Sequence, residues 1–260
     1  MFSRIVVKVG TSTLTHPSGS LHLERLDKLA RTLSDLRNGD RDVLFVTSGA
    51  IGAGSSALNF PAKPETVSGK QAAAAVGQCR LMHVYDKLFS EYGNHVAQIL
   101  VTRGDLTEPR RAASLLRTLE ELFRWGVIPV INENDALSQE EILSEQNIFG
   151  DNDTLSALVA SLVHADLLVL LTDRDGFYDA DPGTNPDAKK LDRVSEITAA
   201  MRSGAGGAGS ARGTGGAITK LAAADIALEK GFPMVIAGGH DPAVLYGILR
   251  GENVGTVFSL

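Results

Sequence analysis

Short apolar segments that alternate with amphipathic ones constrain the fold of this chain more than any other feature. Runs rich in Val, Ile and Leu, bounded by glycine or polar residues, are typical of buried strands. They cover residues 4–10, 42–49, 95–102, 126–132, 166–173 and 233–238, and a similar run, 255–260, closes the chain. Continuous apolar strands separated by helices indicate a mainly parallel sheet covered on both faces. The sequence therefore predicts an α/β fold.

The segments between these strands have helical spacing. In residues 21–39, leucine and alanine recur every three or four positions until Gly39 ends the pattern. Ser68 and Gln71 fit a capping box at the start of the next helix, over 68–93. Further helices are predicted over 109–124, 152–164, 217–230 and 242–250. No repeat or long linker divides the chain.

Charge and cysteine content exclude several classes of protein. The net charge is −6 and the basic residues are dispersed, so no basic face for nucleic acid is predicted. Cys79 is the single cysteine, which fits a reducing compartment. The longest apolar region, 155–171, is interrupted by His164 and Asp166 and is too short to span a membrane. We therefore expect a cytoplasmic protein without nucleic-acid or membrane partners.

Two glycine-rich segments match the dinucleotide-binding pattern. Residues 52–57 follow a strand, but no second strand ends in an acidic residue about twenty positions later. Residues 204–209 follow a helix, which is the wrong context. A nicotinamide oxidoreductase is therefore disfavoured, although it stays an alternative. The P-loop pattern and the protein-kinase loops are absent from the sequence.

Six polar loops follow strands or begin helices. They read KVGTS, TSGAIGAG, INENDA, GDNDT, TDRDG and GTGGAITK. Any one of them alone is more typical of simple turn chemistry. In a parallel α/β sheet, however, such loops meet at the carboxyl ends of the strands, where ligands bind. Together they predict a ligand site at that edge.

Two lysines in these loops indicate phosphate chemistry. Lys8 lies in an apolar strand just before a Gly-Thr-Ser turn, and Lys220 lies near the start of a helix that follows a glycine-rich loop. Ammonium groups in such positions can neutralise phosphate oxygens during transfer. Asp151 and Asp153 would need cationic neighbours to stay ionised in a closed site. The simpler alternatives are surface lysines and an N-capping aspartate.

Seven motifs, in order, carry a resemblance over nearly the whole chain. They are VVKVGTSTLT, VTSGAIGAG, KQAAAAVGQ, VINENDA, GDNDTLSALVA, LLTDRDGFYDADP and GTGGAITKLAAADIA. From Ile5 to about Phe258, the chain resembles the glutamate 5-kinases of the amino acid kinase family. The combination of SGAIGAG, INENDA and GTGG..TK favours these kinases over their acetylglutamate, aspartate, carbamate and uridylate relatives.

The resemblance implies the fold and the reaction. It implies a three-layer αβα sandwich around a mainly parallel eight-stranded sheet. It also implies one amino acid kinase domain over 1–260, with a glutamate-binding lobe at about 1–165 and an ATP-binding lobe at about 166–260. The implied reaction is ATP-dependent phosphorylation of the γ-carboxylate of L-glutamate, the first step of proline synthesis, with ATP and Mg²⁺. No dedicated carboxylate cage for the metal is evident in the sequence.

The resemblance also assigns roles to residues of this chain. Lys8 and Lys220 would contact the phosphates, and Asp153 would hold both lysines in place. The residues that would bind glutamate are Ser48, Gly49, Ala50, Asn132, Asp135 and Asn152. The residues that would bind ATP are Lys8, Gly10, Thr172, Asp173, Thr214, Gly215, Gly216, Ala217, Ile218, Thr219 and Lys220.

The resemblance extends to partners and regulation. It implies a homodimer or homotetramer, feedback inhibition by L-proline, and glutamyl-5-phosphate reductase as a partner; whether the labile product passes directly to that enzyme is left open by the sequence. Many relatives carry a C-terminal RNA-binding-like (PUA) domain, which we do not expect in this chain, and the loop 137–150 looks longer than usual. Two further readings stay open: another amino acid kinase, and a catalytically idle nucleotide- or metabolite-binding module on the same fold.

Overall fold

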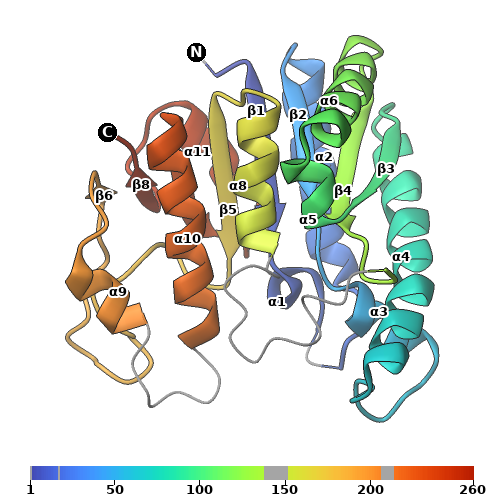
Figure 1. The fold of residues 1–260 in the computed structure, drawn as a ribbon, viewed down its shortest axis with the longest axis horizontal. Coiled ribbons are helices and arrows are strands. Elements are labelled where there is room, and N and C mark those ends of the chain that lie inside the picture. The colour runs from blue at the N-terminus through green and yellow to red at the C-terminus, as the bar shows by residue number, and fades with distance from the viewer. Residues whose placement is uncertain (1, 17, 138–151, 206–213) are drawn as a thin grey trace.

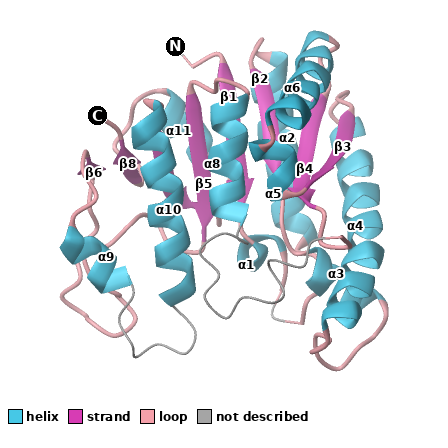
Figure 2. Cartoon of the chain, viewed as in Figure 1, coloured by secondary structure: helices cyan, strands magenta, loops and turns pink. Residues whose placement is uncertain are grey.

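Eight strands form one continuous sheet in the computed structural model, which describes residues 2–16, 18–137, 152–205 and 214–260 (Figures 1 and 2). The strands are β1 (Arg4–Val9), β2 (Asp42–Val46), β3 (Val96–Val101), β4 (Ile128–Glu133), β5 (Leu167–Thr172), β6 (Arg193–Val194), β7 (Met234–Gly238) and β8 (Thr256–Phe258). Their order across the sheet is β3-β4-β2-β1-β5-β7-β8-β6.

The sheet is mainly parallel, as predicted. Every neighbouring pair of strands is parallel except β7 and β8, which are antiparallel. Strand β1 lies between β2 and β5, and Lys8 stands opposite Val46 on one side and Leu170 on the other. The carboxyl ends of the central strands therefore share one edge of the sheet.

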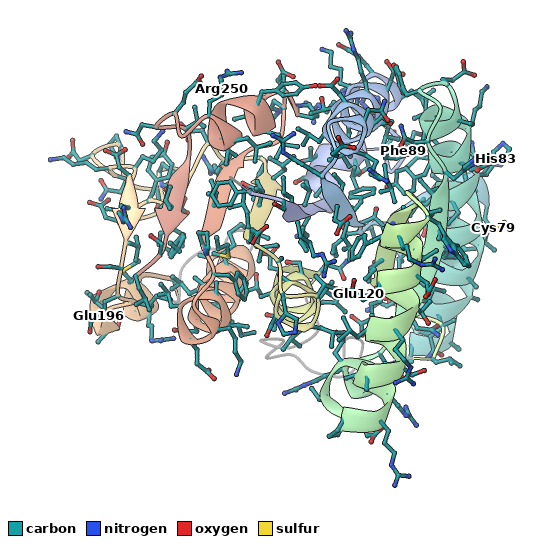
Figure 3. The ribbon with its side chains drawn as sticks, turned by 90° about the horizontal axis from the view of Figure 1, so that it is seen from above. Cys79, His83, Phe89, Glu120, Glu196 and Arg250 are labelled. Atoms are coloured by element: carbon teal, nitrogen blue, oxygen red, sulfur yellow. The ribbon has the colours of Figure 1, made fainter. Side chains whose placement is uncertain are left out.

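Helices cover both faces of the sheet, which gives three layers. They are α1 (Thr11–Leu14), α2 (Leu23–Asn38), α3 (Ala50–Ala57), α4 (Val67–Ser90), α5 (Arg103–Thr107), α6 (Pro109–Arg124), α8 (Asn152–Leu162), α9 (Ala199–Ala205), α10 (Thr214–Lys230) and α11 (Val244–Leu249). Seen from above, Arg250 after α11 and Glu120 on α6 lie on opposite sides of the sheet (Figure 3). This confirms the predicted αβα sandwich.

Alternation along the strands divides the buried apolar residues into two cores. Ile5, Val7 and Val9 of β1 pack with α2, α4 and α11, whereas Val6 packs with α6, α8 and α10. Successive side chains of a strand point to opposite faces. Lys8 has the same parity as Val6, so it points toward the layer of α8 and α10.

Several expectations about individual elements were wrong. Helix α4 begins at Val67 and its N-cap is Thr66, whose side chain accepts a hydrogen bond from the Gly69 amide. The capping box of Ser68 and Gln71 is therefore not formed. Residues 47–54 were expected as a polar loop, but residues 50–54 belong to helix α3 (Ala50–Ala57), so the apparent dinucleotide pattern at 52–57 lies within a helix.

Other expectations are outside the described residues or untested. Asp151 and nearly all of the 137–150 loop belong to the segment 138–151, which the structure does not describe. The division into a glutamate-binding lobe and an ATP-binding lobe stays a prediction. All eight strands belong to one continuous sheet. Among the described residues, no helix is long and apolar enough to cross a membrane.

Candidate active site

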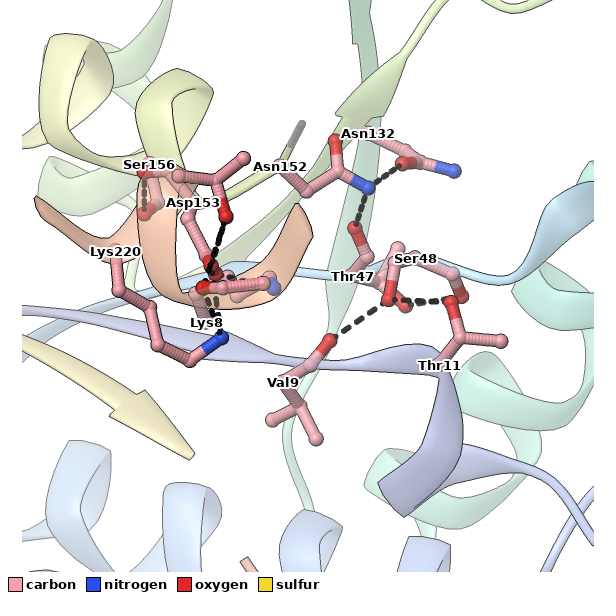
Figure 4. A network of polar contacts seen from close by, with 12 residues as sticks. Lys8, Val9, Thr11, Thr47, Ser48, Asn132, Asn152, Asp153, Ser156 and Lys220 are labelled. Atoms are coloured by element: carbon pink, nitrogen blue, oxygen red, sulfur yellow. Dashed lines mark hydrogen bonds and ion pairs between the residues drawn. The ribbon is translucent and has the colours of Figure 1, made fainter. Parts of the chain in front are cut away.

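A buried ion cluster lies at the carboxyl end of β1. The Nζ atom of Lys8 donates to Asp153 Oδ1 at 2.5 Å, and Nζ of Lys220 donates to Asp153 Oδ2 at 3.2 Å (Figure 4). Thr219 Oγ1 donates to the same Oδ2 at 3.2 Å. The structure thus brings Asp153 together with Lys8, which is 145 positions away in the sequence, and with Lys220, which is 67 positions away.

Burial and charge compete at Asp153. Its side chain is 1% exposed, and such burial alone disfavours the ionised form. The two ammonium groups of Lys8 and Lys220 outweigh that burial and lower the pKa of the Asp153 carboxyl to about 2. The carboxylate is therefore ionised at neutral pH, and the formal charges of the three side chains sum to +1.

Two helix N-termini meet at this cluster. Asp153 lies in the first turn of α8, and Lys220 lies in the second turn of α10, where its Nζ also donates to the Gly216 carbonyl at 3.0 Å. Unpaired amide groups at a helix N-terminus favour negative charge. The sequence predicted that helix α10 begins at residue 217, but it begins three positions earlier, at Thr214.

A second network, made of side-chain amides, adjoins the ion cluster. Asn152 Nδ2 donates to the Thr47 carbonyl at 3.0 Å and to Asn132 Oδ1 at 3.2 Å (Figure 4). Asn132 Nδ2 in turn donates to Gln78 Oε1 at 2.9 Å. Because Asn152 directly precedes Asp153 in α8, the amide network and the ion cluster are fixed by the same helix.

The segment after β2 lies beside these networks. Ser48 Oγ donates to the Val9 carbonyl at 2.9 Å and accepts from Thr11 Oγ1 at 3.2 Å. Gly49 is the N-cap of α3 and has φ of +91°, a conformation that favours glycine. Ala50 follows it and is buried. Asp135 is half-buried in the turn that follows β4.

The residues expected to bind ATP lie around β5 and the start of α10. Gly10 donates its amide to the Leu171 carbonyl at 3.2 Å, which ties the end of β1 to β5. Thr172 is buried and its hydroxyl binds the backbone of Arg174, whereas Asp173 is exposed. Residues 214–220 form the first two turns of α10, and only the backbone of Thr214 and Gly215 is described.

Sequence reasoning missed two residues of these networks. Gln78 lies within the quoted motif KQAAAAVGQ, but it received no role because nothing in the sequence relates it to Asn132. The Thr47 carbonyl was also missed, since a backbone acceptor leaves no mark on residue type. The motif alone was the signal that could have directed attention to Gln78.

Comparison with known proteins decides the family. The family described as the amino acid kinase family matches residues 3–238, most of the chain. The chain belongs to the amino acid kinase family. This assignment agrees with the resemblance that the motifs carry.

Two relatives are similar over almost their whole length. A protein of Clostridium perfringens named glutamate 5-kinase is 53% identical over 255 residues, which cover 98% of this chain and 94% of that relative. A glutamate 5-kinase of Symbiobacterium thermophilum is 54% identical over 256 residues, with 98% and 95% covered. The solved UMP kinase of Ureaplasma parvum matches with a TM-score of 0.65 over 100% of both chains, but at 12% identity it shows the fold alone.

Proposed function

We propose that this chain catalyses the ATP-dependent phosphorylation of the γ-carboxylate of L-glutamate to L-glutamyl 5-phosphate, the first step of proline biosynthesis. The observation that carries the proposal is the pair of lysines fixed on the buried Asp153, next to a network of side-chain amides. The two glutamate 5-kinases that are more than half identical to the chain support the choice of substrate.

The nucleophile requires no activation by a base. A glutamate γ-carboxylate has a reference pKa of about 4.3 and is ionised at pH 7. One of its oxygens forms a bond to the γ-phosphorus of ATP, while the bond from that phosphorus to the β,γ-bridging oxygen breaks and ADP leaves. The main obstacle is repulsion between an anionic nucleophile and the triphosphate.

The positive charge of the cluster around Asp153 would reduce that repulsion. Lys8 and Lys220 contribute two positive charges against one negative charge, and the surplus is held at fixed positions. Fixed charges that face the oxygens of the transferring phosphoryl group stabilise the transition state without reorganisation. Asp153 acts as a positioning residue, because it keeps both ammonium groups in place. The N-termini of α8 and α10 add favourable partial charge.

The remaining expected residues divide between the two substrates. We assign glutamate binding to Ser48, Gly49, Ala50, Asn132, Asp135 and Asn152. We assign ATP binding to Gly10, Thr172, Asp173 and residues 214–220, together with Lys8. Supporting this division, the first set lies around β2, β4 and the start of α8, and the second set lies around β5 and α10, with Lys8 and Gly10 at the carboxyl end of β1, which pairs with both β2 and β5.

We assign no metal ligand to this chain. Within the described ranges, no group of three or more His, Cys, Asp or Glu side chains could hold a metal ion. Mg²⁺ that arrives on the phosphates of ATP would supply further neutralising charge there, and it binds mainly phosphate and water oxygens in such sites.

Assembly, regulation and location are also proposals. We propose a homodimer or homotetramer, inhibition by L-proline, transfer of the product to glutamyl-5-phosphate reductase, and a cytoplasmic location. A measurement of solution mass by light scattering tests the assembly directly, since a 27.5 kDa species would contradict it.

Trapping of the acyl phosphate tests the proposed activity. Protein, ATP, Mg²⁺ and hydroxylamine are mixed with L-glutamate, N-acetyl-L-glutamate or L-aspartate, and the hydroxamate is measured. We expect rapid formation with glutamate and little with the other two acids. Equal or faster formation with N-acetylglutamate would assign the chain to a different amino acid kinase activity. No hydroxamate with any of them would favour an idle binding module.

A further inference from the structure

Two buried amide atoms beside the proposed glutamate site have no hydrogen-bond partner. Five buried side-chain nitrogen or oxygen atoms in the described part of the chain are unpartnered, and two of them are Gln78 Nε2 and Asn152 Oδ1. Both belong to the network that passes through Asn132. Buried polar atoms in folded proteins nearly always have a partner. Two exceptions at the ends of one network indicate a ligand that completes it.

The backbone carbonyl of Thr47 determines which atom of each side-chain amide has no hydrogen-bond partner. Asn152 donates to the Thr47 carbonyl, which can only accept, so this end of the Asn152 amide must be nitrogen. Asn132 must then present its oxygen to Asn152 and its nitrogen to Gln78. Gln78 consequently uses its oxygen within the network. Its unpartnered atom is the nitrogen donor, and that of Asn152 is the oxygen acceptor.

A donor at one end and an acceptor at the other match the head group of an amino acid. The Gln78 amide can donate to a carboxylate, and the Asn152 oxygen can accept from an ammonium group. The order along the network is also fixed. Asn152 adjoins Asp153 and the two lysines, whereas Gln78 is the member farthest along the network from them. The γ-carboxylate must lie near the lysines, so the α-carboxylate is the group that can reach Gln78.

We propose that Gln78 binds the α-carboxylate of the amino acid substrate through Nε2 and determines specificity for a free α-carboxylate. The inference rests on the proposed function, since it takes glutamate as the ligand. Gln78 is 7% exposed and lies on α4, which is packed closely against α3 through Gly54 and Gly77. The amide is therefore held by a rigid element before the substrate arrives.

An exchange of donor and acceptor tests this role. Gln78→Glu keeps an oxygen for Asn132 but replaces the free N–H₂ with an anionic oxygen. The substrates are L-glutamate and L-isoglutamine, which keeps the γ-carboxylate and carries an α-carboxamide in place of the α-carboxylate. Hydroxamate formation is measured at pH 8, where a carboxyl group of reference pKa about 4.3 stays ionised even if burial raises its pKa by a few units.

We expect wild-type protein to prefer glutamate over isoglutamine by at least about tenfold in kcat/KM, since a hydrogen bond to a charged group is lost with the amide. In Gln78→Glu this preference should fall at least about tenfold, because the variant repels the α-carboxylate and accepts from the α-carboxamide. The KM of Gln78→Glu for ATP should stay within about twofold of the wild-type value. The matched control is Gln98→Glu, on the exposed part of β3, which should leave the preference unchanged.

A second variant covers the case in which a buried carboxylate prevents folding. Gln78→Met keeps the volume and removes the donor, so it should also lower the preference for glutamate. A merely structural role would lower kcat/KM for both substrates equally, and an unchanged preference in the folded variant would overturn the inference. Wild-type protein that fails on glutamate altogether would instead overturn the proposed function, and this inference with it.

Discussion

Asp153 is the residue on which the arrangement of the site depends. It is completely buried, and its two oxygens bind one lysine each. A buried carboxylate without partners would be neutral at pH 7, and the two ammonium groups would then repel each other. The shared carboxylate therefore stabilises the fold and also fixes the distance between the two ammonium groups that we propose to face the phosphates.

Replacement of Asp153 by Asn should destabilise the protein at neutral pH. The variant keeps the shape but leaves the buried Lys8 ammonium and the partly buried Lys220 ammonium without a counter-charge. Removal of one partner of a buried ion pair costs about 3–5 kcal/mol. Urea unfolding at pH 7 measures this. The matched control is Asp225→Asn, which breaks an exposed pair with Arg202 and should cost less than about 1 kcal/mol. Equal losses in both variants would contradict the account.

The stability lost in Asp153→Asn should depend on pH. The folded-state pKa of Asp153 is about 2, below its ordinary value of 3.8, so ionisation stabilises the fold above pH 3.8 and this contribution is lost as pH falls through 2. The difference in unfolding free energy between wild type and Asp153→Asn should shrink by about 2 kcal/mol from pH 5 to pH 2, with about half of that lost by pH 3. A constant difference over this range would show that Asp153 has an ordinary pKa.

Lys220 and Asp135 should affect different kinetic constants. Lys220→Ala removes a charge that acts mainly in the transition state, so kcat should fall by about a hundredfold or more. Asp135→Ala should raise chiefly the KM for glutamate, because the Asp135 carboxylate is proposed to bind the substrate and could accept hydrogen bonds from its ammonium group. Lys230→Ala, on the exposed end of the same helix as Lys220, is the control and should behave as wild type. The reverse pattern in the first two variants would contradict the assigned roles.

At the scale of elements, the contact between α3 and α4 aligns the two sides of the proposed glutamate site. A Cβ atom on Gly77 would lie 1.8 Å from the Ala50 carbonyl oxygen, and one on Gly54 would lie 1.8 Å from the Ala73 carbonyl oxygen. Only glycine permits the two helix backbones to approach this closely. Gly77 directly precedes Gln78 in α4, and Ala50 directly follows Gly49 at the start of α3. The contact between the two helices therefore sets the distance between Gln78 and Gly49.

Gly77→Ala should therefore destabilise the protein, although alanine is ordinarily the better helix former by about 1 kcal/mol. Overpacking of this kind costs about 1–3 kcal/mol, and separation of the helices should also raise KM for glutamate. Thermal unfolding and steady-state rates measure both effects. Gly52→Ala in α3 is the matched control, because its Cβ would have its nearest neighbour at 3.8 Å. A Gly77→Ala variant as stable as Gly52→Ala would disprove close packing here.

Much of the fold followed from local pattern. The central strands β1, β2, β4, β5 and β7 were predictable because they are buried on both faces and read as continuous apolar runs. Helix α3 was not, because its glycines and serines have low helix propensity and their packing against α4 is a tertiary effect. Strand β6 has two residues, too few for a periodic pattern.

The candidate site was predictable where chemistry shows in residue type. Lys8, Asp153 and Lys220 were identified as charged groups in strand-end loops, and the parity of Lys8 along β1 explains why it faces α8 and α10. Gln78 was not identified, because its partnership with Asn132 links residues 54 positions apart and depends on how α4 packs. The carbonyl of Thr47, which orients the amides, has no counterpart in side-chain chemistry.

At the scale of the whole molecule, every proposed site residue lies at one edge of the sheet. The polar loops after β1, β2, β4 and β5, with the N-termini of α8 and α10, meet there, as expected for a parallel α/β sheet (Figure 1). Under the proposed function, such a convergence would let the amino acid and the nucleotide bind on neighbouring loops with their reacting groups at the buried lysines.

If glutamate and L-proline bind at the same site, L-proline should compete with glutamate. Proline keeps an α-carboxylate and a cationic nitrogen, so it can occupy the head-group contacts, but it has no γ-carboxylate to phosphorylate. We expect inhibition that rising glutamate relieves, by mass action. Rates at several glutamate concentrations, with and without millimolar proline, measure this. D-Proline is the control, and inhibition that glutamate does not relieve would place the proline site elsewhere.

Transfer of phosphate to a carboxylate oxygen is the central claim, and an isotope measurement tests it most directly. The protein is incubated with ATP, Mg²⁺, hydroxylamine and glutamate labelled with ¹⁸O in the γ-carboxylate. Hydroxylamine attacks the carbonyl carbon of the acyl phosphate, so the bridging oxygen leaves with the phosphate. We predict that each inorganic phosphate released with hydroxamate carries one ¹⁸O atom from glutamate. Phosphate without the label would contradict the account, because the γ-carboxylate would not have been the acceptor.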